Sequence, residues 1–166
     1  MASSRTRLTF CGMILRIDAI DRKILAFLQE EGRLTVTELA GRIPLSVSRC
    51  QRRVRELEVN GVLRGYHADI DPTAAGLGFP AIVFVTMRQE DQTTVADFET
   101  QIAQVREIVS AQRLFGDPDY LLRVVAADLD SYRRLYDERL ASLPGVQRLT
   151  STLVMKDLIG ARGLPL

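Results

Sequence analysis

The sequence has few of the residues that support disulfide frameworks, metal clusters or histidine chemistry. It contains two cysteines, Cys11 and Cys50, and a single histidine, His67, among 166 residues. Two cysteines build no disulfide framework and supply no four-cysteine metal site, so we expect no metal and no cofactor. Cys50 falls on an apolar helical stripe and is interpreted as a small core residue, which fits a reduced, cytoplasmic setting.

Sequence signals for catalysis and for membrane insertion are also lacking. We find no nucleophile–base pair, metal-ligand cluster or phosphate-binding loop, and a lone histidine in an extended segment is usually structural, so we predict no enzyme activity. No segment approaches the roughly 20 apolar residues that cross a bilayer. The apolar run from Leu8 to Leu15 is short and broken, which disfavours a signal peptide. Residues 1–16 are interpreted as an N-terminal extension, with Met13 as a hypothetical natural start.

Charge is divided unevenly along the chain. Residues 1–65 hold twelve Lys and Arg against seven Asp and Glu, a balance of +5. Residues 66–166 hold ten against fourteen, a balance of −4. A basic front and an acidic back suggest two domains, with the front facing a polyanion.

Two short helices are predicted at the start of the front part from apolar residues at helical spacing. Asp18 can cap the first of them and Gly32 can end it. Thr35 and Glu38 have the spacing of a capping box and begin a second helix of about two turns.

A third helix follows a tight turn imposed by Pro44, because the residue before a proline is pushed out of helical geometry. Ser46 is a suitable N-cap, and Asn60-Gly61 can end the helix. Three small helices with a tight turn between the second and third form a helix-turn-helix.

The third helix has one apolar face and one polar face rich in arginine, as a helix that reads the major groove requires. The alternative is an ordinary solvated face. Nearly all basic residues of this chain are arginines, so an arginine-rich helix face by itself is a weak signal of DNA binding. The turn, the cap and the short second helix favour double-stranded DNA as the partner. Facing angles place Arg53 at the edge, as a structural or phosphate contact. The candidate DNA-binding residues are Thr35, Ser46, Ser48, Arg49, Arg52, Arg53 and Arg55.

Several stretches resemble the Lrp/AsnC (feast/famine) family of transcriptional regulators. They are Asp18–Leu25, Leu45–Ser48 with the Arg53-Val54 and Leu57 that follow, and Gly61–Tyr66, in the family's order and spacing. Pro44 stands where the family more often has glycine. The resemblance implies a sequence-specific DNA-binding regulator with a three-helix (winged) helix-turn-helix domain and a linker strand that takes part in a dimer contact.

The back part is predicted to alternate strand, helix, strand, strand, helix, strand, which is the ferredoxin-like βαββαβ order, so the chain is assigned to the α+β class. Predicted strands span residues 81–87, 108–115, 120–127 and 146–155, with helices starting at Thr94 and at Asp128 or Asp130. The first and third strands are apolar on both faces, although helices cover only one. A second copy of the sheet is the simplest cover, which predicts a homodimer.

The hairpin from Gly116 to Leu122 also matches the family, in which this domain binds amino acids between dimers that assemble to tetramers or octamers. Free N–H groups of a turn can bind a carboxylate, and Asp117 and Asp119 can accept from an ammonium group. Without the resemblance, this stretch would be interpreted as an ordinary hairpin turn. Small polar residues of the last strand could come from a neighbouring subunit. The candidate effector-binding residues are Gly116, Asp117, Pro118, Asp119, Tyr120, Thr150, Ser151 and Thr152.

Two alternatives remain beside an amino-acid-responsive regulator. An architectural DNA-binding protein without effector would bind DNA in a salt-dependent but sequence-blind manner. A siroheme-decarboxylase-like enzyme on the same fold is disfavoured by the single histidine. The predicted divisions are the extension 1–16, the helix-turn-helix domain 17–64, a linker strand and turn 65–78, a ferredoxin-like effector-binding and oligomerisation domain 79–157, and a C-terminal tail 158–166.

Overall fold

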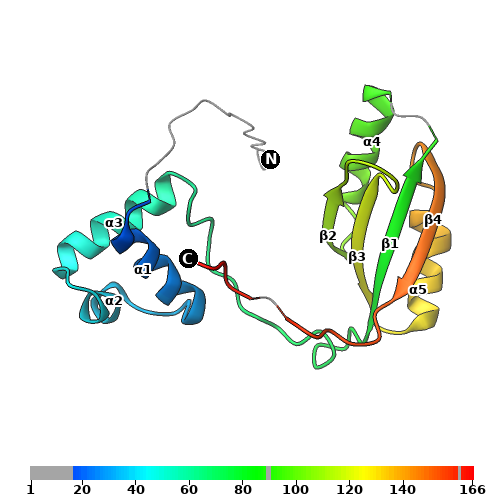
Figure 1. Ribbon diagram of the computed structural model, residues 1–166. Coiled ribbons are helices and arrows are strands. Elements are labelled where there is room, and N and C mark those ends of the chain that lie inside the picture. Colours follow the sequence, from blue (N-terminus) through cyan, green and yellow to red (C-terminus); the bar gives the residue numbers. More distant parts are fainter. Residues whose placement is uncertain (1–16, 89–90, 161) are drawn as a thin grey trace, which may run out of the picture. The chain divides into compact units, whose positions relative to one another are not determined.

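The computed structural model describes residues 17–88, 91–160 and 162–166, and the chain divides into two compact units. Of the described residues, one unit comprises 17–68 together with 162–166, and the other comprises 69–88 and 91–160 (Figure 1). Each unit has its own hydrophobic core. The extension predicted for residues 1–16 lies outside the described residues. Among those described, no helix is long and apolar enough to cross a membrane.

The first unit is built from three short helices, as predicted. They are α1 (Ala19–Glu30), α2 (Val36–Arg42) and α3 (Val47–Val59). Capping boxes begin α1 at Asp18 and α2 at Thr35, because each side chain accepts a backbone N–H of the first turn. Gly32 directly follows Glu31, the C-cap of α1, which is the position where a glycine commonly ends a helix. The buried residues of this unit are Ile24, Leu25, Leu28, Leu39, Ala40, Ile43, Cys50, Val54 and Leu57.

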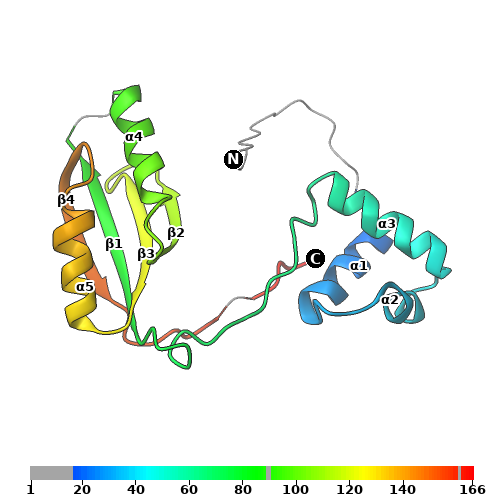
Figure 2. The ribbon, with the colours of Figure 1, turned by 180° about the vertical axis from the view of Figure 1, so that it is seen from behind.

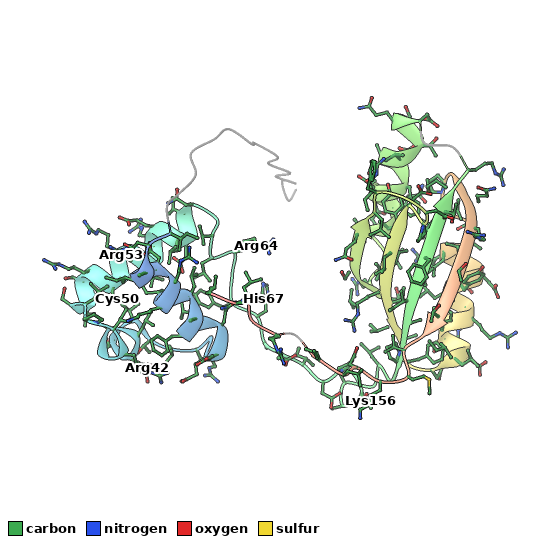
Figure 3. The ribbon with its side chains drawn as sticks, viewed as in Figure 1. Arg42, Cys50, Arg53, Arg64, His67 and Lys156 are labelled. Atoms are coloured by element: carbon green, nitrogen blue, oxygen red, sulfur yellow. The ribbon has the colours of Figure 1, made fainter. Side chains whose placement is uncertain are left out.

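Cys50 lies inside this core, as predicted, with none of its surface exposed (Figure 3). Burial raises the pKa of its thiol, because an apolar environment disfavours the thiolate. The thiol is therefore held in its protonated, unreactive form.

The linker strand predicted after α3 does not form within one chain. Residues 65–70 have no strand pairing in the structure. A strand requires another strand beside it to bond its backbone groups, and the described part of the chain offers none here. The predicted turn does form, because the Asp71 side chain accepts the N–H of Thr73 at 2.8 Å and the Asp71 carbonyl accepts that of Ala75.

The second unit has the predicted βαββαβ order. Its elements are β1 (Phe79–Met87), α4 (Gln92–Ile102), β2 (Ile108–Arg113), β3 (Tyr120–Ala126), α5 (Leu129–Leu135), the π-helical turn η1 (Tyr136–Leu140) and β4 (Val146–Leu153). The four strands form an antiparallel sheet in the order β2-β3-β1-β4. One prediction was wrong in detail: Asp91, and not Thr94, caps α4, and its carboxylate accepts the Thr94 N–H at 3.0 Å.

Both helices of this unit cover the same face of the sheet (Figure 2). Alternate residues of β1 and β3 point into the layer between sheet and helices, where Val83 and Leu122 are fully buried. Their neighbours along each strand lie on the opposite, helix-free face and stay half-exposed. We call this helix-free side the open face. Its apolar members are Ile82, Phe84, Leu121 and Val125.

The end of the chain packs on the first unit, beside α1. The Gln29 side chain accepts the backbone N–H of Leu164 at 2.5 Å and donates to its carbonyl at 3.3 Å. A Cβ on Gly163 would approach the Gln29 side chain to 3.1 Å, so a glycine allows this close contact. The segment predicted as a C-terminal tail is therefore held at its end by a two-bond clamp.

Candidate DNA-binding surface and effector site

The exposed side of α3 carries the residues predicted to read DNA. Ser48, Arg49 and Arg52 are all exposed, and 71% of the Arg52 side-chain surface is accessible. Glu56 lies 3.8 Å from the Arg52 guanidinium, too far for a hydrogen bond, so the arginine keeps its donors available. These three residues lie along a shallow hollow of about 660 Å³, whose full lining is Ile20, Leu45, Ser48, Arg49, Arg52 and Arg53.

Arg53 joins α3 to the start of α1. Its guanidinium donates to the Asp18 carboxylate at 2.7 Å and to the Asp21 carboxylate at 2.8 Å. The hydrogen bonds from Arg53 to Asp21 and Asp18 raise the pKa of the guanidinium. Backbone donation from Asp21 lowers the pKa of Asp18, and the Arg53 side chain lowers it further. Arg53 thus neutralises two carboxylates beside the α3 surface.

Two of the predicted DNA-binding residues, Thr35 and Ser46, also stand at helix N-caps, and they differ in whether the hydroxyl group makes a capping bond. The Thr35 hydroxyl donates to the Glu38 carboxylate at 2.7 Å and accepts the Glu38 N–H, so the capping box occupies it. Ser46 stands at the N-cap of α3, as predicted, but its side chain makes no capping bond. Its hydroxyl lies 3.3 Å from that of Ser48, and both are exposed. Arg55 is exposed as well.

At the far end of the sheet, Asp119 fixes the hairpin between β2 and β3. Its N–H donates to the Val85 carbonyl at 2.9 Å, and its own carbonyl accepts the N–H of Leu114 at 2.7 Å. Its carboxylate accepts the N–H of Met87 at 2.7 Å. Asp119 therefore holds the hairpin in place through its backbone and its side chain, a role that its charge alone did not predict.

Asp117 lies toward the open face. The Thr86 hydroxyl donates to its carboxylate at 3.3 Å, and the Arg148 guanidinium lies 3.8 Å away. Thr86 is one of the half-exposed residues of β1 that point away from the helices. Both predicted ammonium acceptors of the hairpin thus already have partners within the chain.

A pocket of about 380 Å³ lies between the hairpin, β1 and α4. It contains Gly116, Asp119 and Tyr120 of the predicted set, but not Asp117 or Pro118. Its other lining residues, which sequence reasoning missed, are Met87, Val95, Arg113, Leu114 and Phe115. Of these, only Arg113 could have been found from the sequence. Strand alternation places it on the helix side of the sheet, where its guanidinium lies over the ring of its strand partner Tyr120.

The predicted β4 residues do not reach this pocket within one chain. Thr150, Ser151 and Thr152 pair with residues 82–84 of β1, and none of them lines the pocket. The Ser151 hydroxyl lies 2.5 Å from that of Tyr132 on α5, so it faces the helix layer. Thr150 and Thr152 alternate with it and point to the open face.

The fold and these surfaces define a class: a DNA-binding transcription regulator with a separate ligand-binding domain. Residues 17–58 match the AsnC-type helix-turn-helix domain, and residues 80–164 match the Lrp/AsnC ligand binding domain. The chain belongs to the Lrp/AsnC family of transcription regulators.

Named relatives are similar along most of the chain. The leucine-responsive regulatory protein of Escherichia coli K12 is 35% identical over 142 residues, covering 86% of this chain and 87% of the relative. The transcriptional activator DecR of the same strain is 33% identical over 150 residues, covering 90% and 99%.

Solved structures show the same similarity in three dimensions. A Neisseria meningitidis regulator in complex with L-methionine aligns with a TM-score of 0.83 at 36% identity, covering 89% of this chain and 96% of that one. A feast or famine regulatory protein of Mycobacterium tuberculosis, also complexed with L-methionine, aligns with a TM-score of 0.80 at 34% identity, covering 88% and 97%.

Proposed function

We propose that this regulator binds a roughly palindromic operator as a homodimer and that a free amino acid tunes its binding. The observation that carries the proposal is the exposed α3 surface of Ser48, Arg49 and Arg52, which the Arg53 contacts hold on the domain. A two-fold dimer would place two such helices in successive major grooves.

Within this surface we assign different tasks to different residues. Ser48, Arg49 and Arg52 lie on the outward side of α3 near its start, where such helices reach base edges. Ser46 and Arg55 are exposed at the flanks and suit phosphate contacts. Thr35 and Arg53 use their side chains for contacts within the domain, so we assign them support of the surface.

The open face supports the homodimer. Phe84 and Leu121 are paired neighbours in the sheet, and Ile82 and Val125 lie further along the open face toward the start of β1. An apolar strip with no helix over it is typical of a surface that is covered by another molecule, and a second copy offers a matching strip. We propose further assembly to tetramers or octamers through contacts near the hairpin.

The pocket beside the hairpin supports the effector. Its volume of about 380 Å³ falls within the range of small-ligand sites, and it combines an apolar floor with one arginine and one aspartate. Two solved relatives of the same fold were captured with L-methionine. We propose that Gly116, Asp119 and Tyr120 contact the effector, and that Asp117, Pro118, Thr150 and Thr152 belong to the surface that a neighbouring subunit closes over it. Ser151 would support this surface from the helix side, through its contact with Tyr132.

We propose no catalytic role for the chain. His67 is exposed in the linker and lies outside the pocket, whose described lining holds no histidine or cysteine. Among the described residues, no group of three or more metal-binding side chains gathers at one place.

The test of the DNA-binding surface begins with an operator selected by the full-length protein from a random duplex library. Fluorescence anisotropy on that operator should show that Arg49→Ala and Arg52→Ala each lose about 1–3 kcal/mol of binding free energy if they read bases. Arg133→Ala on α5, whose side chain is 72% exposed, is the matched control and should bind like the parent. Unchanged affinity in both α3 variants would contradict the assignment.

The same experiment separates a regulator from an architectural protein. Selection that enriches no sequence, with binding that still weakens steeply with salt, would contradict sequence-specific binding. A thermal-shift screen of the free amino acids tests the effector, because a ligand of the folded state raises apparent stability. If none of them shifts the transition, the effector part of the proposal is wrong.

A further inference from the structure

Arg113, the last residue of β2, lies at the rim of the pocket beside the hairpin. Its guanidinium stands 5.9 Å from the centre of the Tyr120 ring, and 54% of its side-chain surface is exposed. Asp119, whose carbonyl accepts the Leu114 N–H across the hairpin, lines the same pocket. A cation and a carboxylate therefore share one small cavity with an apolar floor of Met87 and Val95.

Neighbouring groups orient the Arg113 guanidinium without occupying its N–H donors. Glu99 on α4 lies 3.7 Å from its guanidinium, which is beyond hydrogen-bond distance. The nearer partner of Glu99 is the Tyr120 hydroxyl, which donates to it at 3.0 Å. Burial and this bond raise the pKa of Tyr120 to about 12, so the hydroxyl stays protonated and keeps donating. Arg113 is thus oriented by a ring and a carboxylate while it retains N–H groups for a ligand.

The carboxylate of Asp119, which lines the same pocket, is held by a backbone donor. One of its carboxylate oxygens accepts the Met87 N–H at 2.7 Å, which fixes the direction of the group. The second oxygen keeps acceptor capacity, because an ionised carboxylate has about four lone-pair sites. Fixed charges of opposite sign beside an apolar floor complement a zwitterion with an apolar side chain, and they disfavour an acidic side chain near Asp119 and Glu99.

We infer that Arg113 is the specificity residue that binds the carboxylate of the effector, with Asp119 facing the ammonium group and Met87 and Val95 receiving an apolar side chain. This inference rests on the proposed function, because it names the recognising group within the pocket assigned to the effector. A charge-assisted hydrogen bond from an arginine is stronger than one from a neutral donor, so this contact contributes a large share of the selectivity.

The test compares L-methionine with its methyl ester, which keeps the side chain and the ammonium group but has no carboxylate charge. Calorimetry on the full-length protein should show that Arg113→Gln weakens L-methionine binding about 10- to 150-fold and leaves binding of the ester nearly unchanged. Glu99→Gln keeps an acceptor for the Tyr120 hydroxyl but removes the charge that competes for Arg113. It should tighten L-methionine binding about 2- to 5-fold.

The outcomes separate this inference from the proposed function. If the parent protein binds neither L-methionine nor any other amino acid, the proposed effector function itself fails. If the parent binds L-methionine and Arg113→Gln binds it equally well, or loses ester and amino acid alike, Arg113 does not recognise the carboxylate. An unliganded melting temperature and a light-scattering mass equal to those of the parent establish that each variant is folded and assembled.

Discussion

Replacing Arg53 with Gln should destabilise the helix-turn-helix domain and weaken DNA binding only as a consequence. The guanidinium bonds to Asp21, whose side chain is 12% exposed, and to Asp18, which is more exposed. Hydrogen bonds to charged groups contribute about 1.5–3 kcal/mol, and breaking a fully buried pair costs about 3–5 kcal/mol. Because the Asp21 contact is only partly buried, we expect a loss of about 2 kcal/mol in the free energy of unfolding.

Urea unfolding followed by circular dichroism, with operator binding by anisotropy, measures both effects. Arg55→Gln on the same helix is the control and should stay within about 0.5 kcal/mol of the parent, because its side chain is exposed. In the double variant Arg53→Gln/Asp21→Asn, no uncompensated Asp21 charge remains, so the loss should be smaller than the sum of the single losses. If Arg53→Gln unfolds like the parent but loses tenfold in operator affinity, Arg53 acts on DNA directly.

Two further predictions concern assembly and the chain end. Leu121→Asp on the open face should convert the dimer to a monomer with a light-scattering mass near 18.6 kDa. The control Gln104→Asp, on an exposed loop, should leave the dimer intact. A stable Leu121→Asp dimer would place the interface elsewhere. Gln29→Ala should speed hydrogen exchange at the Leu164 amide about 2- to 10-fold, because the amide loses its acceptor. The control Gln101→Ala should leave this exchange rate unchanged. Equal exchange rates in both variants would mean that Gln29 does not hold the tail.

Local chemistry explains which parts of the fold the sequence could predict. Asp18 with Asp21, and Thr35 with Glu38, lie three residues apart, so their capping boxes follow from spacing alone. The first and third strands are apolar at nearly every position, so an apolar face without a helix over it could likewise be predicted. Ser46 shows the limit of such reasoning. It stands at the N-cap as predicted, but its hydroxyl lies near that of Ser48 and makes no capping bond.

The predictions that failed depend on partners distant in sequence. The strand expected at the start of the linker 65–78 needs a neighbouring strand, and the described residues of the single chain supply none. The pocket joins Met87, Val95 and Arg113 from three different elements, and no spacing rule relates them. The prediction relied instead on the acidic residues of the hairpin, which are visible in sequence because they are adjacent.

The choice of variant for the effector site follows from this difference. The sequence indicated Asp117 and Asp119 as acceptors for an ammonium group, which would make Asp119 an obvious residue to replace. In the structure the same carboxylate receives the Met87 N–H, and the backbone of Asp119 bonds both Val85 and Leu114. Replacing Asp119 would loosen the hairpin whether or not a ligand binds there, so a lost response would not identify its cause. Arg113 makes no such backbone-holding contact through its side chain, and its charge is what distinguishes an amino acid from its ester. A loss confined to the charged ligand can therefore be assigned to recognition and not to folding.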